Sequence, residues 1–310
     1  MTCELPEQRD STDEEEHVKE LPTFPCRLFV YLAREAPVGV VLRRGPSAWV
    51  QLSVWHTDTD TFEHGQWFKG RVYERRADVS ADGALFVYFA AQSGRRQPAD
   101  SWTAISRPPY FTALALWYSF FGTYGIGGFF PGHHELLLAT GPKPPHLGQL
   151  PARLTLSTAP PPYIDRTNDW TDRTVFINRL LRDGWEQVPA ARETWQHRNP
   201  EGDLTLVMTR PHAWTTYGGW SMPGEPIVSE YAVFMESRGD VIPLGRATWA
   251  DWDQRGRLVI AQDGRLFHWE PPGTLRELAD FNPQRPDPAP APAWAETWPL
   301  AWTRGTPRKR

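Results

Sequence analysis

Acidic residues close to tryptophans are the side chains in this sequence with the clearest chemical use. They are Asp169, Asp172, Asp251 and Asp253. A pair of carboxyl groups can supply the acid and the base that cleave a glycosidic bond, and a neighbouring indole ring offers an apolar face to a sugar. These positions are therefore compatible with a pocket that binds, and hydrolyses, a glycan.

An aromatic segment at residues 212–226 (HAWTTYGGWSMPGEP) suggests a different use. Tryptophan, tyrosine and arginine concentrate binding energy at protein interfaces, and long loops on a rigid fold commonly carry function. We predict that binding residues come from this segment and from the acidic segment before it. They are Asp169, Trp170, Trp214, Tyr217 and Trp220.

The motifs of several enzyme classes are missing. The sequence has no Gly-x-Ser-x-Gly elbow, no His-Glu-x-x-His pattern and no Cys-x-x-Cys pair. The main prediction is therefore a non-catalytic scaffold that binds a protein partner, without catalytic residues or a cofactor. The alternative is a pocket lined by Trp and Asp for a glycan or small molecule, with hydrolysis as a further option.

The segment of residues 55–65 (WHTDTDTFEHG) carries imidazole and carboxylate groups that suit a metal ion. The candidate ligands are His56, Asp58, Asp60, Glu63 and His64. An EF-hand calcium loop would need another oxygen ligand at Phe62 and a glycine after it, and both are missing. A polar turn between two strands is the favoured interpretation, and no metal site is predicted.

Two further motifs are interpreted as structural. His133 and His134 would point to opposite faces of a strand, so they would not share a metal, and one buried histidine is expected with Glu135 on the surface. The glycines of residues 122–128 lack the Gly-Lys-Ser/Thr end of a phosphate-binding loop. A bend between core strands is favoured there.

Composition limits the class of protein. The 310 residues carry 33 Lys and Arg against 37 Asp and Glu, a formal net charge of −4, so general nucleic-acid binding lacks the positive surplus it needs. Cys3 and Cys26 do not make a disulfide framework, and no secretory signal is recognised, so a soluble cytoplasmic protein is predicted. Glycines interrupt the uncharged residues 108–132, which favours strands over a membrane span.

Three regions are expected along the chain. Residues 1–22 are predicted to be a disordered acidic tail, and residues 23–282 the folded domain, with a proline-rich insertion near 141–163. Residues 283–310 are predicted to be an extended tail rich in Pro and Trp, because proline at this density prevents helix and sheet hydrogen bonding. The tryptophans of this tail are expected to pack back onto the domain.

Short apolar runs dominate the predicted domain. They span residues 28–32, 38–42, 49–55, 85–90, 136–138, 204–208, 231–235 and 258–261. Such runs, separated by Gly, Pro, Asp and Asn, are typical of strands. Residues 174–185 differ, because Val175, Ile177 and Leu180 follow a helical spacing before Gly184, and one short helix is predicted there.

A glycine-containing turn followed by alternating apolar residues recurs along the chain. The glycines are Gly45, Gly83, Gly132, Gly202 and Gly256. A period of about 40 to 55 residues is typical of β-propellers, whose blades are four-stranded sheets packed around an axis. The interval before Gly202 is longer because it contains the proline-rich insertion.

Two segments with Asp-Gly turns, VSADGALFVYFA at residues 79–90 and IAQDGRLFHW at residues 260–269, resemble the strand-turn-strand core of WD40-like and TolB-type propeller repeats. The resemblance implies an all-β, β-propeller-like fold of about five four-stranded blades with one short helix. The chain departs from WD40 repeats because it lacks their regular Gly-His and Trp-Asp pairs. An irregular β-sandwich is the alternative architecture.

Overall fold

The computed structural model describes most of the chain. The described residues are 25–45, 47–92, 94, 98–120, 122, 125, 127–163, 172–189, 191, 193–200, 202–210 and 228–303. Strands dominate this part of the chain, and α1 (Asp172–Arg182) is its one α-helix of more than four residues. No helix among the described residues is long and apolar enough to cross a membrane.

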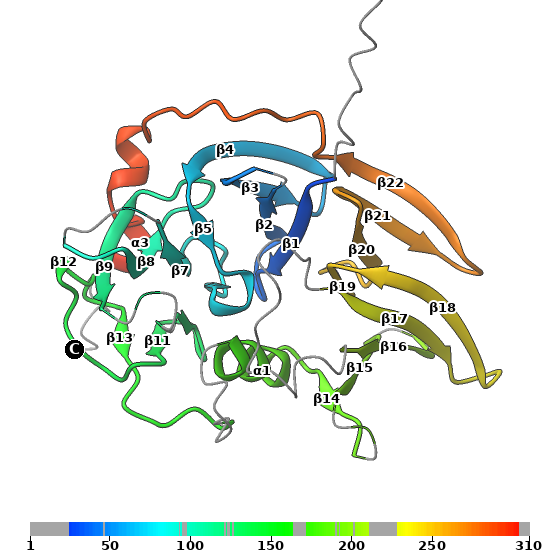
Figure 1. The fold of residues 1–310 in the computed structure, drawn as a ribbon. Helices are drawn as coiled ribbons and strands as arrows, with labels where there is room; N and C mark the ends of the chain where they lie inside the picture. Colours follow the sequence, from blue (N-terminus) through cyan, green and yellow to red (C-terminus); the bar gives the residue numbers. More distant parts are fainter. Residues whose placement is uncertain are drawn as a thin grey trace, which may run out of the picture.

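Five sheets follow one another along the described residues (Figure 1). The first contains β1 (Arg27–Leu32), β2 (Val38–Arg44), β3 (Trp49–His56) and β4 (Thr61–Lys69). The second contains β5 (Arg71–Val72), β6 (Asp78–Val79), β7 (Phe86–Ala91), β8 (Ser101–Ser106), β9 (Ala113–Ser119) and the later β12 (Leu147–Gly148). The third contains β10 (Gly128–Phe129), β11 (Glu135–Leu138) and β13 (Thr155–Leu156).

The remaining two sheets come after helix α1. The fourth contains β14 (Glu186–Gln187), β15 (Thr194–Arg198), β16 (Leu204–Thr209), β17 (Ser229–Met235) and β18 (Asp240–Ala247). The fifth contains β19 (Trp249–Trp252), β20 (Leu258–Gln262), β21 (Arg265–Glu270) and β22 (Thr274–Asp280). Sequential strands of both sheets pair antiparallel.

The predicted all-β, β-propeller-like fold with about five blades and one short helix is confirmed. Each of the five glycine-containing turns leads into a strand of a different sheet, namely β3, β7, β11, β16 and β20. Four strands per blade hold for the first and fifth sheets, whereas the third has three. The third sheet is short because the following insertion is rich in proline, which has no N–H to donate to a sheet.

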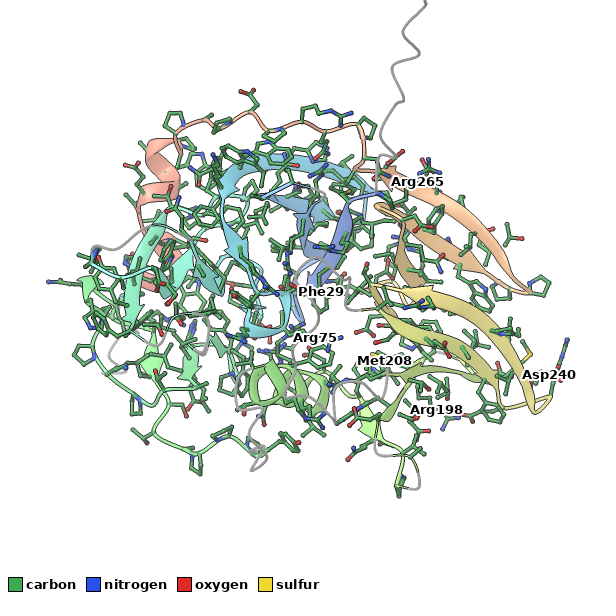
Figure 2. The ribbon with its side chains drawn as sticks, in the orientation of Figure 1. Phe29, Arg75, Arg198, Met208, Asp240 and Arg265 are labelled. Atoms are coloured by element: carbon green, nitrogen blue, oxygen red, sulfur yellow. The ribbon has the colours of Figure 1, made fainter. Side chains whose placement is uncertain are left out.

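The sheets radiate from a common centre. The first strand of a sheet is buried on both faces, as in β1 and β19, whereas the last strands β4 and β22 are largely exposed. Figure 2 shows the same gradient, with Phe29 of β1 near the centre and Asp240 at the outer tip of the fourth sheet. Blades packed face to face in this way bury their inner strands without a helical layer.

The first and fifth sheets lie side by side and close the ring. Strand β1 lies against β19 and β20, and the Thr248 hydroxyl donates to the Leu28 carbonyl at 2.7 Å. The Cys26 amide donates to Asn282 Oδ1 at 2.9 Å. On the opposite side, helix α1 lies between the third and fourth sheets and contacts β10 (Figure 1).

Residues 283–303 run from the fifth sheet back over the first sheet to the second (Figure 1). The Trp302 indole is buried, and its Nε1 donates to Asp82 Oδ2 at 2.9 Å. The Trp298 Nε1 donates to the Gln149 carbonyl at 3.0 Å. The Trp294 ring lies 4.7 Å from the Arg107 guanidinium. This segment therefore packs against the blades through its three tryptophans.

Candidate functional site

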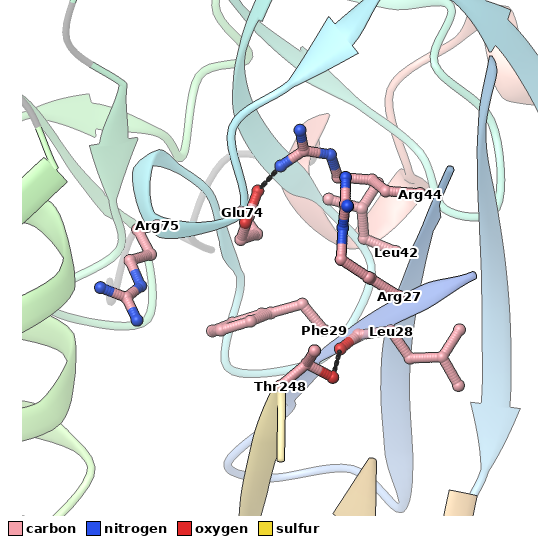
Figure 3. Close-up of a pocket in the computed structure, with 8 residues that line it drawn as sticks. All are labelled: Arg27, Leu28, Phe29, Leu42, Arg44, Glu74, Arg75 and Thr248. Carbon is pink, nitrogen blue, oxygen red and sulfur yellow. Dashed lines mark hydrogen bonds and ion pairs between the residues drawn. The ribbon is translucent and has the colours of Figure 1, made fainter. Parts of the chain in front are cut away.

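Three cavities among the described residues are candidate ligand sites. The smallest, about 10 Å³, lies between β1, η1 (Glu74–Arg76) and Thr248 (Figure 3). The salt bridge of Arg44 with Glu74 spans it. Its volume is that of about one water molecule, so it has no room for an organic ligand.

The largest of these three cavities, about 920 Å³, is a groove between the start of β1 and the segment after β22. Its charged side chains are three arginines and Asp263. The Arg43 guanidinium donates to three backbone carbonyls, those of Phe281, Gly45 and Gln284. With a single carboxylate, which sits in the β20–β21 turn, the groove has no pair of groups for acid and base chemistry.

The third cavity, about 210 Å³, is lined by the inner elements of the ring and is called the central pocket. Its lining comes from β1 and the residues after it, from helix α1 and its end, from β15, and from β19 and the turn that follows. The ionisable lining residues are Arg34, Arg179, Asp183, His197, Asp251 and Asp253. Trp249 and Trp252 complete the wall, with only 6% and 7% of their surface exposed.

The end of helix α1 positions Asp183. The Trp185 amide donates to the Leu180 carbonyl at 2.9 Å and the Gly184 amide to the Leu181 carbonyl at 3.4 Å, which is the hydrogen-bond pattern of a Schellman motif. Gly184 has φ +89°, as that motif requires, and a Cβ there would lie 3.2 Å from His197 Nε2. The predicted helix stop at Gly184 is therefore correct, and it places Asp183 and His197 close together.

Asp183 sits where a negative charge is disfavoured. Burial raises the pKa of its carboxyl group, although the charge of Arg182 and the hydrogen bonds from it act in the opposite direction. Arg182 Nε donates to Asp183 Oδ1 at 2.7 Å. The negative end of the helix dipole also disfavours the carboxylate. Asp183 is consequently a candidate proton donor, with a quarter of its side-chain surface still exposed.

Asp251 comes from the inner strand of the fifth sheet and accepts three hydrogen bonds. The His197 Nδ1 lies 2.7 Å from its Oδ1, and the Trp252 amide donates to the same oxygen at 2.9 Å. The Trp185 Nε1 donates to Oδ2 at 3.1 Å. The side chain keeps 17% of its surface exposed, so Asp251 is held in place and remains accessible from the pocket.

His197 is the third titratable group of the pocket. Burial disfavours its charged form, but the hydrogen bond and charge of Asp251, with the charge of Asp183, outweigh burial and raise the pKa of His197. Its ring centre lies 5.2 Å from that of Trp185. The histidine therefore balances the charge of Asp251 while both face the same small cavity.

Asp253 lines the pocket but is fully engaged in closing the ring. The Arg255 and Arg257 amides donate to its Oδ1 at 2.9 Å each, and Arg257 also makes two 2.8 Å hydrogen bonds to Asp60 in the β3–β4 turn. The side chain of Asp253 has no exposed surface. Asp60, Asp253 and Arg257 are called the ring-closing cluster, and its role is structural.

The turn interpretation of residues 55–65 agrees with the structure, in which residues 57–60 join β3 to β4. Asp60 adopts φ +56° in this turn and binds Arg257. His64 points elsewhere, toward the Ser53 hydroxyl at 3.1 Å and Gln284. Across the residues placed by the structure, no group of three or more His, Cys, Asp or Glu side chains could hold a metal ion.

The two adjacent histidines lie in the bend before β11. His133 Nε2 pairs with Glu35 Oε1 at 2.9 Å on the surface, whereas the His134 ring meets the Trp302 ring edge to face at 4.8 Å. The glycines of residues 122–127 lie between β9 and β10, as the expected bend between strands requires, and Gly122 has φ +54°. At Gly127 a Cβ would lie 1.8 Å from the Arg76 carbonyl oxygen, so only glycine fits this close approach.

The predicted binding residues Asp169, Trp170, Trp214, Tyr217 and Trp220 lie outside the described residues. The structure does bring together one of the acidic residues named for a glycan pocket with two tryptophans, because Asp251, Trp249 and Trp252 line the same cavity. Sequence reasoning missed Asp183 and His197. The helix stop at Gly184 is the one signal that marked the region of Asp183, and His197 carries no local motif.

Comparisons with known proteins give distant structural matches only. No family model matches the chain, and no curated protein matches it. Two solved structures of the GH43 protein BlXynB from Bacillus licheniformis, one of them a mutant, align with 86% of this chain at 12% and 11% identity and TM-scores of 0.34 and 0.33. The alignments span 56% of the length of the BlXynB chains.

The main prediction, a non-catalytic scaffold with a protein partner, is corrected, and its alternative of a pocket lined by Trp and Asp replaces it. Among the described residues, Asp183, Asp251 and His197 line one cavity together with two tryptophans. The scaffold prediction rested on aromatic residues of 212–226, which were assumed to be exposed. The function proposed below rests on the residues that line the central pocket.

Proposed function

We propose that this protein binds a glycan, or a small molecule with similar hydroxyl groups, in the central pocket and hydrolyses it. The observation that carries the proposal is the presence of two carboxyl groups with different surroundings in one cavity. Asp183 has a raised pKa through burial, whereas Asp251 is paired with His197. Two titratable groups in contrasting environments are the usual arrangement for an acid and its partner base.

The volume limits the ligand. Ligand pockets of proteins usually measure about 300–1,000 Å³, so a pocket of about 210 Å³ suits a single sugar ring. Trp249 and Trp252 supply apolar wall, and carboxylates and guanidinium groups supply partners for hydroxyl groups. Such a mixture of aromatic wall and few polar groups is typical of small-molecule sites.

The chemical roles follow from the different surroundings of the two carboxyl groups. Asp183 would donate its proton to the leaving-group oxygen of the glycosidic bond. Asp251 would act as the base toward the attacking water, whose proton it takes, so that one water is added across the broken bond. His197 would keep the Asp251 carboxylate oriented through the 2.7 Å hydrogen bond.

The proposal is tested with a panel of nitrophenyl glycosides and with ligand-observed NMR of the matching free sugars. We expect hydrolysis of at least one glycoside, reduced on the order of a hundredfold or more in Asp183→Asn and in Asp251→Asn. Asp240→Asn, on the exposed outer tip of the fourth sheet, is the matched control and should keep full activity. Absence of both sugar binding and hydrolysis would overturn the proposal.

Three further properties of the protein remain predictions from its sequence. They are the WD40-like or TolB-type character of the blades, a cytoplasmic location, and the division of the chain at residues 22 and 282. Limited proteolysis followed by mass spectrometry tests the division, because cleavage should concentrate in tails rather than in blades.

A further inference from the structure

The charges around the central pocket do not cancel. Asp78 is bound by Arg179 through Nε at 3.2 Å and by Arg182. Arg182 also binds Asp183 at 2.7 Å, and His197 pairs with Asp251. With Asp183 protonated, as its proposed role requires, the carboxylates of Asp78 and Asp251 face the guanidinium groups of Arg179 and Arg182, so this set has no negative charge left to balance a further cation.

Arg34 is the cation left over. It lines the central pocket just after β1, and its NH2 group makes a long hydrogen bond of 3.4 Å to the Phe130 carbonyl. The neighbouring carboxylate, Glu35, lies on the surface, where its Oε1 is 2.9 Å from His133 Nε2. Partial burial and the charge of Arg182 lower the pKa of Arg34, and the charges of Asp78, Asp183 and Glu35 act in the opposite direction without cancelling this shift. An anion bound beside Arg34 would therefore supply an ion pair that Arg34 lacks among the described residues.

The guanidinium group also has suitable geometry for one kind of anion. Arginine presents parallel N–H donors that match a carboxylate bidentately, and such charge-assisted bonds are about twice as strong as neutral ones. At the other side of the same small cavity, the Asp251 carboxylate would repel an anion, and both Asp183 and Asp251 offer oxygens to hydroxyl donors. One ligand satisfies both sides only if it carries an acidic group at one end and hydroxyl groups at the other.

We infer that the ligand of the central pocket is an acidic sugar of the uronic acid kind, whose carboxylate binds Arg34 while its hydroxyl groups face Asp183 and Asp251. This inference rests on the proposed glycan function and adds the substrate class to it. Arg34 is then a specificity-determining residue and takes no part in the chemistry of bond cleavage.

The test compares each neutral sugar with its own uronate, using glucose with glucuronate and galactose with galacturonate, by ligand-observed NMR titration at low ionic strength. For the wild-type protein we expect the uronate of at least one pair to bind on the order of tenfold more tightly. In Arg34→Gln the preference should fall to within about twofold, because the loss of affinity falls mainly on the uronate. Arg34→Lys should keep part of the preference, because the charge remains but the fork is lost.

The control is Arg255→Gln, an exposed arginine on the turn after β19 that does not line the pocket. It should leave the preference as in the wild type. Equal binding of neutral sugars and uronates by the wild-type protein would overturn the inference and leave the glycan function standing. Failure of every sugar to bind would overturn both, and a preference that survives in Arg34→Gln would remove Arg34 from its role.

Discussion

Asp251 and Asp253 lie two residues apart at the inner end of the fifth sheet, yet they belong to different kinds of cluster. Asp253 is enclosed by Arg257 and by two backbone amides, and its side chain has no exposed surface. Asp251 is paired with His197 and faces the central pocket. The ring-closing cluster therefore uses a permanently charged partner in a dry environment, whereas the pocket uses a titratable partner beside a cavity.

The comparison shows how one strand end serves both stability and chemistry. A guanidinium that satisfies two carboxylates, Asp60 and Asp253, has no protonation state to change near neutral pH. The pair of His197 and Asp251 can gain or lose a proton, and Asp183 is disfavoured as an ion by burial. Burial of the ionisable Asp183 carboxyl group in the pocket costs folding stability, whereas Asp253 of the ring-closing cluster is compensated by Arg257. Such a cost is common at functional sites.

The largest expected effect is on the ring-closing cluster. Arg257→Gln leaves the buried carboxylate of Asp253 without its cation, so the free energy of unfolding should fall by about 3–5 kcal/mol. Urea unfolding at pH 7 measures it. The matched control is Arg265→Gln, because the Arg265 side chain is itself half-exposed and pairs with Glu277 and Asp280 at the surface. This variant should cost less than about 1 kcal/mol. Similar losses in both variants would contradict a special role for ring closure.

The next effect concerns the junction of helix α1 and the pocket. Gly184→Ala should cost about 1–2 kcal/mol from the left-handed backbone alone, and more because the new Cβ meets His197 at 3.2 Å. Gly239→Ala is the matched control, with φ +70° and open space around it. A larger loss in Gly184→Ala, accompanied by a shifted His197 NMR signal, is the expected result. Equal losses would show that the contact with His197 is unimportant.

Asp183→Asn should separate stability from function. Because the pKa of Asp183 is raised, its carboxyl favours the folded state fully below the unfolded value of 3.8, and this contribution is lost as the pH rises through the folded value. At pH 7 the variant should therefore be as stable as the wild type, within about 1 kcal/mol, while sugar hydrolysis is lost. A strongly destabilised variant would instead place Asp183 in a structural role like that of Asp253.

The smallest effect is the pH dependence contributed by His197. Its pKa is raised by Asp251, so the contribution of the pair to stability is fully present below pH 6.5 and is lost as the pH rises through the folded value. Relative to His197→Gln, the wild-type protein should lose about 1 kcal/mol of stability between pH 6.5 and pH 9. Unfolding curves at these two pH values measure it, and parallel behaviour of the two proteins would argue against the pair.

Much of the architecture could be predicted because it depends on local patterns. The apolar runs correspond to strands of all five sheets, and the Asp-Gly turn at residues 263–264 has positive φ at both residues, as a tight hairpin between β20 and β21 needs. The number of strands per blade was less predictable. That number depends on which sheet edge each short segment pairs with, as β12 pairs with β9 and β13 with β11.

The sequence alone determined the strands, the five glycine-containing turns and the end of helix α1. It also identified Asp251 and Asp253 as candidate functional carboxyl groups. Tertiary structure decided which of the two carboxylates is available. Strict alternation along a strand would put both on one face, but β19 ends at Trp252, and the turn that follows directs Asp253 to Arg257. Closure of the ring and the placement of helix α1 then bring His197 and Asp183 to Asp251, because residues far apart in sequence meet only where inner elements converge.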